Sequence, residues 1–139
     1  MTSAPASDFA EFMSRRLAAS TAFVNGDIAP LHQISTRTSP ATIFGPQGDA
    51  VQGAEQVNAV NARGAAMFGP DAENVFEVMH QYAQDNLAYW VGIQRSVVHM
   101  SGHDQPIPMD LRVTEIFRRE QSGWMLIHRH ADPLTGTVD

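Results

Sequence analysis

Apolar residues near the start of the chain recur at the spacing of an α-helix. This helix is predicted to begin near Asp8 and to end at Asn25-Gly26-Asp27, where Gly26 suits a left-handed position. Arg15 and Arg16 are expected to point away from its apolar stripe. The residues of the stripe are Phe9, Met13, Leu17 and Val24.

Two further helices are predicted before the pattern changes. The shorter one is capped by Asp27, and the longer one begins near Ala54 and is stopped by Gly69-Pro70. Between them, residues 41–44 are predicted to form a short strand and residues 47–53 a loop.

From Asn74 onward apolar and polar residues alternate, which is the period of β-strands. Four strands are predicted, over residues 74–82, 87–100, 109–120 and 124–131. Short connections between them require antiparallel pairing. One face of the first strand is expected to carry Phe76, Val78, His80 and Tyr82. Helices followed by a run of strands indicate an α+β domain with its helices on one face of the sheet.

The length of 139 residues suits one domain, predicted to span residues 8–132, with flexible ends at residues 1–7 and 133–139. A net charge of −6 argues against a nucleic-acid surface, which needs clustered Lys and Arg. No apolar run approaches the roughly 20 residues of a membrane span, and no signal peptide is visible. Together with the absence of cysteine, this predicts a cytoplasmic protein that binds neither nucleic acid nor membranes.

The last predicted strand changes from apolar to titratable at His128-Arg129-His130-Ala131-Asp132. Strand alternation places His128 and His130 on one face and Arg129 on the other. The histidines could ligate a metal with Asp132, form hydrogen bonds with their neighbours or lie at a dimer interface, or act as acid or base in a pocket. We take both as candidate catalytic residues and expect no metal and no cofactor.

Glu115 lies in the middle of the preceding strand, with apolar neighbours on its face. A carboxylate in this position is either ion-paired, with Arg95 or Arg129, or has a raised pKa that suits proton transfer. Glu115 is therefore the third candidate catalytic residue.

Several other side chains are candidates for contact with a substrate. Arg112, on the face opposite Glu115, could bind an anionic substrate or pair with Asp110 or Asp132. Tyr89 and Trp90 point to opposite faces of their strand, so one of them is expected to line the pocket. The predicted substrate-binding residues are Phe44, Met79, Tyr89, Trp90, Arg112, Arg129 and Asp132.

The order of elements and several short motifs resemble one known family. The motifs are Asn25-Gly26-Asp27, Ile43-Phe44-Gly45-Pro46, Arg112-Val113-Thr114, Phe117-Arg118-Arg119, Gly123-Trp124 and His128-Arg129-His130-Ala131-Asp132. Over residues 8–132 this pattern is similar to SnoaL-like domains of the nuclear transport factor 2-like superfamily, which includes ketosteroid isomerase. The resemblance implies a cone-shaped α+β fold with three helices, in which a strongly bent antiparallel or mixed sheet wraps around a long N-terminal helix. It also implies an apolar pocket and a homodimer formed through the sheet.

Of the three catalytic positions of the isomerases, one has a matching residue type in this chain. The tyrosine of helix one corresponds to a place near Ala19, and the general base to Ile43-Phe44-Gly45, which has no carboxylate. A second acid, kept protonated to donate a hydrogen bond, would fall near Glu115. The closing His-x-His also resembles the association domain of calcium/calmodulin-dependent kinase, which has an arginine where this chain has Ala131.

These observations predict a pocket protein for a small, largely apolar organic molecule. If it is catalytic, the chemistry is expected to be proton transfer without a cofactor, as in isomerases, dehydratases or cyclases. The alternative is a non-catalytic module for dimerisation or ligand sensing.

Overall fold

The computed structural model describes residues 5–136, so the predictions for residues 1–4 and 137–139 lie outside it. Helix α1 spans Pro5–Val24 and begins three residues before the predicted start at Asp8. Gly26 ends the helix as predicted, in the left-handed region with a φ of 92°. Here the backbone N–H of Asp27 donates to the carbonyl oxygen of Ala22 at 2.8 Å.

Two more helices complete the helical part of the described chain. Helix α2 spans Ala29–Ile34, and helix α3 spans Ala54–Ala65, which ends before the predicted stop at Gly69-Pro70. None of the helices in residues 5–136 has the length and apolar character needed to cross a membrane.

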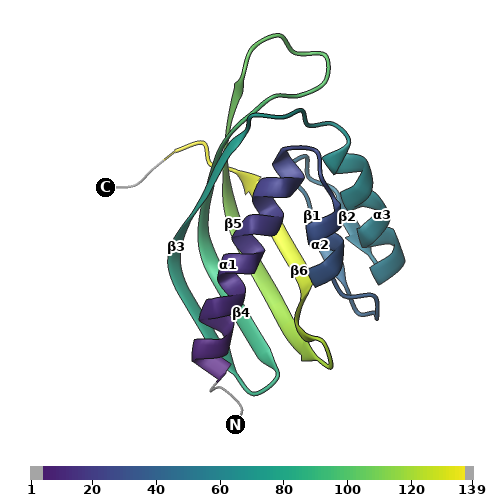
Figure 1. Ribbon diagram of the computed structural model, residues 1–139, viewed down its shortest axis with the longest axis vertical. Helices are drawn as coiled ribbons and strands as arrows, with labels where there is room; N and C mark the ends of the chain where they lie inside the picture. The colour runs from purple at the N-terminus through teal and green to yellow at the C-terminus, as the bar shows by residue number, and fades with distance from the viewer. Residues whose placement is uncertain (1–4, 137–139) are drawn as a thin grey trace.

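The strands form one six-stranded sheet with the order β2-β1-β6-β5-β4-β3 (Figure 1). They are β1 (Thr42–Phe44), β2 (Ala50–Gln52), β3 (Glu73–Gln84), β4 (Leu87–Val98), β5 (Ile107–Glu120) and β6 (Gly123–Pro133). Strand β1 runs parallel to β6, and every other pair is antiparallel. The sheet is curled but not closed, and α1 lies across its concave face. The predicted cone-shaped α+β fold with three helices and a mixed sheet is confirmed.

Strand β2 contradicts the prediction that residues 47–53 form a loop. Ala50–Gln52 pairs antiparallel with β1, and the connecting turn includes Gly48 at a φ of 87°. Three residues beside two glycines carry too little alternation to mark a strand, so only the partner strand makes it one.

The prediction of a single face for Phe76, Val78, His80 and Tyr82 is wrong because strand β3 contains a β-bulge. Val78 pairs with Gly92 and His80 with Val91, which leaves Met79 as the extra residue. The bulge turns the rest of the strand over. Phe76 therefore stacks on the buried Trp90, with ring centroids 4.5 Å apart, whereas His80 contacts Tyr89 on the convex face.

The core lies between α1 and the concave face of the sheet. Phe9 from α1 packs against Phe117 of β5 and Trp124 of β6, with ring centroids 5.3 and 5.6 Å apart. All three residues are at most 3% exposed. Each buried aromatic side chain contributes about 1.5–3 kcal/mol through the hydrophobic effect, so this cluster anchors α1 to the sheet.

Candidate functional site

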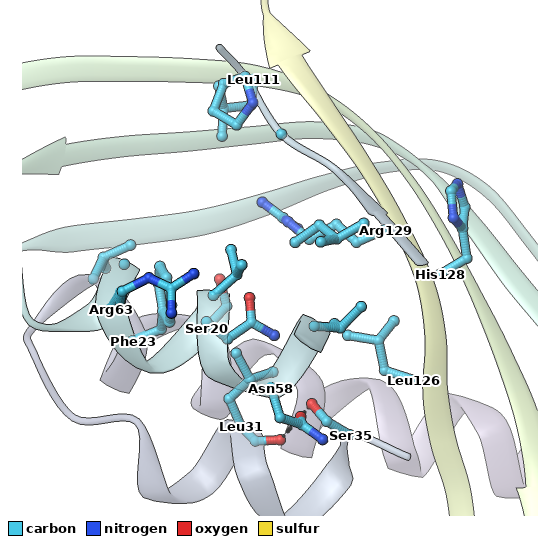
Figure 2. Close-up of a pocket in the computed structure, with 18 of the residues that line it drawn as sticks. Ser20, Phe23, Leu31, Ser35, Asn58, Arg63, Leu111, Leu126, His128 and Arg129 are labelled. Atoms are coloured by element: carbon cyan, nitrogen blue, oxygen red, sulfur yellow. Dashed lines mark hydrogen bonds between the residues drawn. The ribbon is translucent and has the colours of Figure 1, made fainter. Parts of the chain in front are cut away.

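A cavity of about 540 Å³ opens beside this core. It lies between the C-terminal half of α1, helices α2 and α3, strand β1 and the concave side of β4–β6 (Figure 2). Most of its wall is apolar and includes Phe23, Leu31, Val57, Val60, Met109, Leu111 and Leu126. Its main polar feature is a group of side chains around Arg129, which extends from β6 towards the middle of the cavity.

Glu115 lies beneath Arg129 and is completely buried. Its Oε1 accepts hydrogen bonds from Arg16 Nε at 2.8 Å and Trp90 Nε1 at 2.7 Å. Its Oε2 accepts from Arg16 Nη2 at 2.7 Å and Arg129 Nη1 at 2.6 Å. A carboxylate has about four lone-pair sites, so the acceptor capacity of Glu115 is filled.

Arg16 corrects the prediction that Arg15 and Arg16 both point away from the core. It follows Phe12 by four residues and Met13 by three, which places it on the same helical face as these buried side chains. The residue is only 2% exposed. Its Nη1 is buried without a hydrogen-bond partner, and its guanidinium lies 5.8 Å from the ring centroid of Phe76.

A chain of neutral polar groups holds Arg129 on its other side. Its Nη2 donates to Gln94 Oε1 at 2.7 Å. The amide nitrogen of Gln94 donates in turn to Ser20 Oγ at 3.2 Å and to Asn74 Oδ1 at 2.9 Å. Because the Gln94 amide has partners on both of its ends, its oxygen is fixed towards Arg129.

The protonation of the group follows from its packing. Burial alone would raise the pKa of Glu115, but the charges and hydrogen bonds of Arg16 and Arg129 outweigh it and lower this pKa to about 2. Burial lowers the pKa of Arg129; the charge of Glu115 opposes this effect and that of Arg16 adds to it. Arginine side chains stay protonated in proteins, so Arg16 and Arg129 carry two positive charges and Glu115 carries one negative charge at neutral pH.

The two histidines of β6 share one face, as strand alternation predicts. The rings of His128 and His130 both pack edge-on against Phe44, with centroids 5.0 and 5.4 Å apart. His128 lies at the edge of the cavity, where its Nδ1 and Thr42 Oγ1 are 2.7 Å apart. Burial and the neighbouring His130 lower the pKa of His128. Of the predicted catalytic residues, His128 is thus the one that borders the cavity, but its ring, like that of His130, lies on the face of β6 opposite Arg129 (Figure 2).

Apart from His128 and Arg129, the predicted site residues do not line the cavity. Trp90 lies behind Glu115 as its hydrogen-bond donor, and Tyr89 points to the convex face. Arg112 and Asp132 form a two-pronged ion pair on the convex face, at 2.6 and 2.7 Å. His130 Nε2 lies 3.5 Å from Asp132 Oδ2 on the same surface. The structure therefore divides the predicted residues between two faces of the sheet, and Met79 and Phe44 also lie outside the cavity wall.

Sequence reasoning missed three residues of the site: Arg16, Gln94 and Ser20. Arg16 could have been found from its spacing to Phe12 and Met13. Gln94 and Ser20 give no comparable signal, because isolated polar residues of these types are common on surfaces. For Glu115, the prediction of an ion pair with Arg129 is confirmed, whereas Arg95 pairs instead with Glu77 and Asp110 on the convex face.

A metal site receives no support from the geometry. Within residues 5–136, no three side chains of His, Asp or Glu gather closely enough to hold a metal ion.

Comparison with known proteins gives one family. Residues 16–134 match the SnoaL-like domain family. No curated protein sequence is significantly similar to this chain.

Several solved structures, among them members of the nuclear transport factor 2-like family, share this fold at low identity. One, from Streptomyces avermitilis and provisionally called a dehydratase, is 19% identical, with a TM-score of 0.79 over 95% of this chain and 99% of that one. A second structure, from Thiobacillus denitrificans, is provisionally called a calcium/calmodulin-dependent protein kinase type II association domain. It is 19% identical, with a TM-score of 0.69 over 88% of this chain and 94% of that one. A ketosteroid isomerase-like protein from Erwinia carotovora is 17% identical, with a TM-score of 0.68 over 89% of this chain and 94% of that one. At these identities the likeness concerns the fold alone.

Proposed function

Because this chain belongs to the SnoaL-like domain family, whose model covers residues 16–134, we propose that it binds a small, largely apolar organic molecule in the cavity beside Arg129. The observation that carries the proposal is the combination of apolar walls with a single group of rigidly held donors. The volume of about 540 Å³ lies in the range of about 300–1,000 Å³ that is typical of small-molecule sites.

The apolar walls supply affinity, and Arg129 supplies orientation. Leu31, Leu111 and Leu126 line the cavity from three different elements, so an apolar body would contact side chains on several sides. Arg129 is held by Glu115 and Gln94, and its remaining N–H groups can therefore meet a polar ligand atom with little loss of side-chain entropy.

Glu115 has a positioning role in this proposal and does not transfer protons. A general acid or base needs a pKa near the working pH and contact with the reacting group. Glu115 has a pKa of about 2, is completely buried, and accepts hydrogen bonds at both oxygens. The observations thus favour ligand binding, without a proton carrier at this position.

Blocking the cavity tests the proposal. Adding the neutral probe 1-naphthol should shift the methyl NMR signals of Leu111 and Leu126, because both line the cavity. Val60→Trp, on α3, should abolish these shifts by filling the cavity. The matched variant Ala59→Trp, on the neighbouring exposed position of α3, should preserve them. Unchanged methyl signals at millimolar probe, or equal binding by both tryptophan variants, would refute the assignment.

A second proposal concerns assembly and rests on the convex face of the sheet. Exposed apolar side chains gather there on β3 and β4, including Val75 (55% exposed), Met79 (64%) and Val97 (36%). Apolar patches on a sheet surface mark interaction sites, and a homodimer through this face would cover them.

Sedimentation of the full chain tests the homodimer. Met79→Glu is expected to shift the protein towards monomer, since it places a charge in the covered patch. Gln81→Glu adds the same charge to the same strand, but Gln81 pairs with the inward-facing Trp90 and lies on the other face, so it should leave the mass unchanged. A parent protein that sediments as a monomer at high micromolar concentration would contradict this proposal.

A further inference from the structure

We infer that the ligand of this cavity is an organic monoanion: an apolar body with one carboxylate, which docks on Arg129. The inference rests on the proposed function, because it names the chemical class of the molecule that the cavity would hold. Four observations carry it: an imbalance of charge, a filled carboxylate, free donors, and apolar walls.

The buried charges do not balance. Arg16 and Arg129 share the single carboxylate of Glu115, which leaves one positive charge in excess. Arg129 completes its contacts on the neutral oxygen of Gln94. A positive charge that is poorly solvated and paired only in part favours the approach of an anion.

No other carboxylate of the described chain compensates this charge within the cavity. The charged side chains that line the cavity are Arg16, Arg63, Arg129 and Asp49. The Asp49 carboxylate lies back against Gly45 in its own loop, where its Oδ1 occupies the space that a side chain on Gly45 would need. The surface that faces a ligand is therefore cationic.

Both buried arginines retain donors for a further acceptor. A guanidinium carries five N–H groups. Arg129 uses one on each terminal nitrogen for Glu115 and Gln94, and its side chain is 16% exposed beside the cavity (Figure 2). Arg16 is 2% exposed and also lines the cavity, and its Nη1 has no hydrogen-bond partner. Glu115 has no acceptor site left for these donors, so a second carboxylate would have to come from outside the protein.

The apolar walls select an organic acid over an inorganic anion. A hydrated chloride or phosphate would fill little of the cavity and leave Phe23, Leu31 and Leu111 in contact with water. A carboxylic acid with an aryl or alkyl body satisfies the arginines at one end and covers the walls with the other. The same acid would lose much of its affinity if its charge were removed.

Matched acid and amide pairs test the inference on the unmodified protein. Binding of 4-phenylbutyrate and 4-phenylbutanamide would be compared by calorimetry at pH 7 and fixed ionic strength, with hexanoate and hexanamide as a second pair. Within each pair the acid should bind at least about tenfold more tightly, because a charge-assisted hydrogen bond replaces a neutral one. Sodium chloride and phosphate alone are expected to show no saturable binding at the concentrations used.

Variants locate the effect. Arg129→Gln should abolish the preference for the acid, so that the ratio of the two affinities falls from at least about tenfold to about one. Arg112→Gln is the matched control, because Arg112 lies on the convex face and its loss should leave the preference for the acid intact. Circular dichroism checks that Arg129→Gln folds. If this variant does not fold, the comparison of acid and amide in the parent protein decides whether the cavity prefers an organic anion.

The outcomes separate this inference from the proposed function. Equal affinities for acid and amide would overturn the inference and leave the binding of an apolar molecule in place. If Arg129→Gln still binds the acid more tightly than the amide, the inference is also overturned, because the carboxylate would then bind to a residue other than Arg129. If none of the four compounds and no 1-naphthol binds, both the inference and the proposed function fail.

Discussion

Replacing Glu115 by glutamine should destabilise the fold by about 3–4 kcal/mol at neutral pH. The pKa of Glu115 falls from 4.5 to about 2 in the folded protein, a difference of about 2.5 units at about 1.4 kcal/mol each. Loss of one partner from a buried ion pair costs about 3–5 kcal/mol, which agrees with this value. The amide would retain one oxygen for the donors of Arg16 and Arg129, and its NH₂ group would meet donors where the carboxylate accepted.

The same shift predicts how stability depends on pH. A folded-state pKa below the unfolded value means that the stabilisation is complete above about pH 4.5 and is lost as the pH falls towards 2. Urea unfolding, followed by circular dichroism between pH 7 and pH 3.5, measures both quantities. The parent protein should lose stability below about pH 4.5, and Glu115→Gln should show a flatter profile over that range.

Glu77→Gln is the matched control for this experiment. Glu77 also accepts a short hydrogen bond from an arginine, at 2.6 Å from Arg95, but its side chain is 53% exposed. Solvent screens such a pair, so its loss should change stability far less than the loss of Glu115. A Glu115→Gln variant within about 1 kcal/mol of the parent, or one with an unchanged acid profile, would refute the argument.

Three further predictions concern the surroundings of this carboxylate. Trp90→Phe keeps an aromatic ring but removes one donor to Glu115, and should lower the free energy of unfolding by about 1.5–3 kcal/mol in the same urea assay. Gly92→Ala should destabilise by at least about 1–3 kcal/mol in that assay, because the added Cβ would overlap the backbone oxygen of Glu77; a smaller loss would mean that the bulge can yield. His128 should titrate below pH 6.5 in an NMR experiment, because burial lowers its pKa, and a midpoint at or above 6.5 would contradict its placement.

Much of the fold was predictable because each of its long elements repeats its own period several times. Helix α1 spans 20 residues and strand β5 spans 14, and periods of this length stand out from chance. Short or irregular elements could not be distinguished from chance in the sequence pattern. Strand β2 has three residues, and the bulge at Met79 depends on the partner strand, so neither is encoded by local alternation.

The site was predictable only in part, because its members come from distant segments. A carboxylate among apolar neighbours at Glu115 required a partner, and Arg129 was one of two candidates. The second partner, Arg16, lies 99 residues away in sequence on α1. Its helical spacing was visible, but an arginine on an apolar helix face normally turns its charge to solvent, and only the position of Glu115 reverses that expectation.

The resemblance to isomerases predicts a carboxyl group near Glu115 but does not predict its protonation. An acid at this place in ketosteroid isomerase stays protonated because its surroundings are apolar, and it donates a hydrogen bond to the substrate. In this chain burial also acts to raise the pKa of Glu115. The guanidiniums of Arg16 and Arg129, within 2.8 Å of the carboxylate, outweigh this effect and keep it ionised. The donor that faces the cavity is consequently Arg129, and the carboxylate fixes its orientation. In this chain a buried carboxyl group thus stays ionised and presents a cation to the cavity, because charged neighbours from other elements decide its protonation.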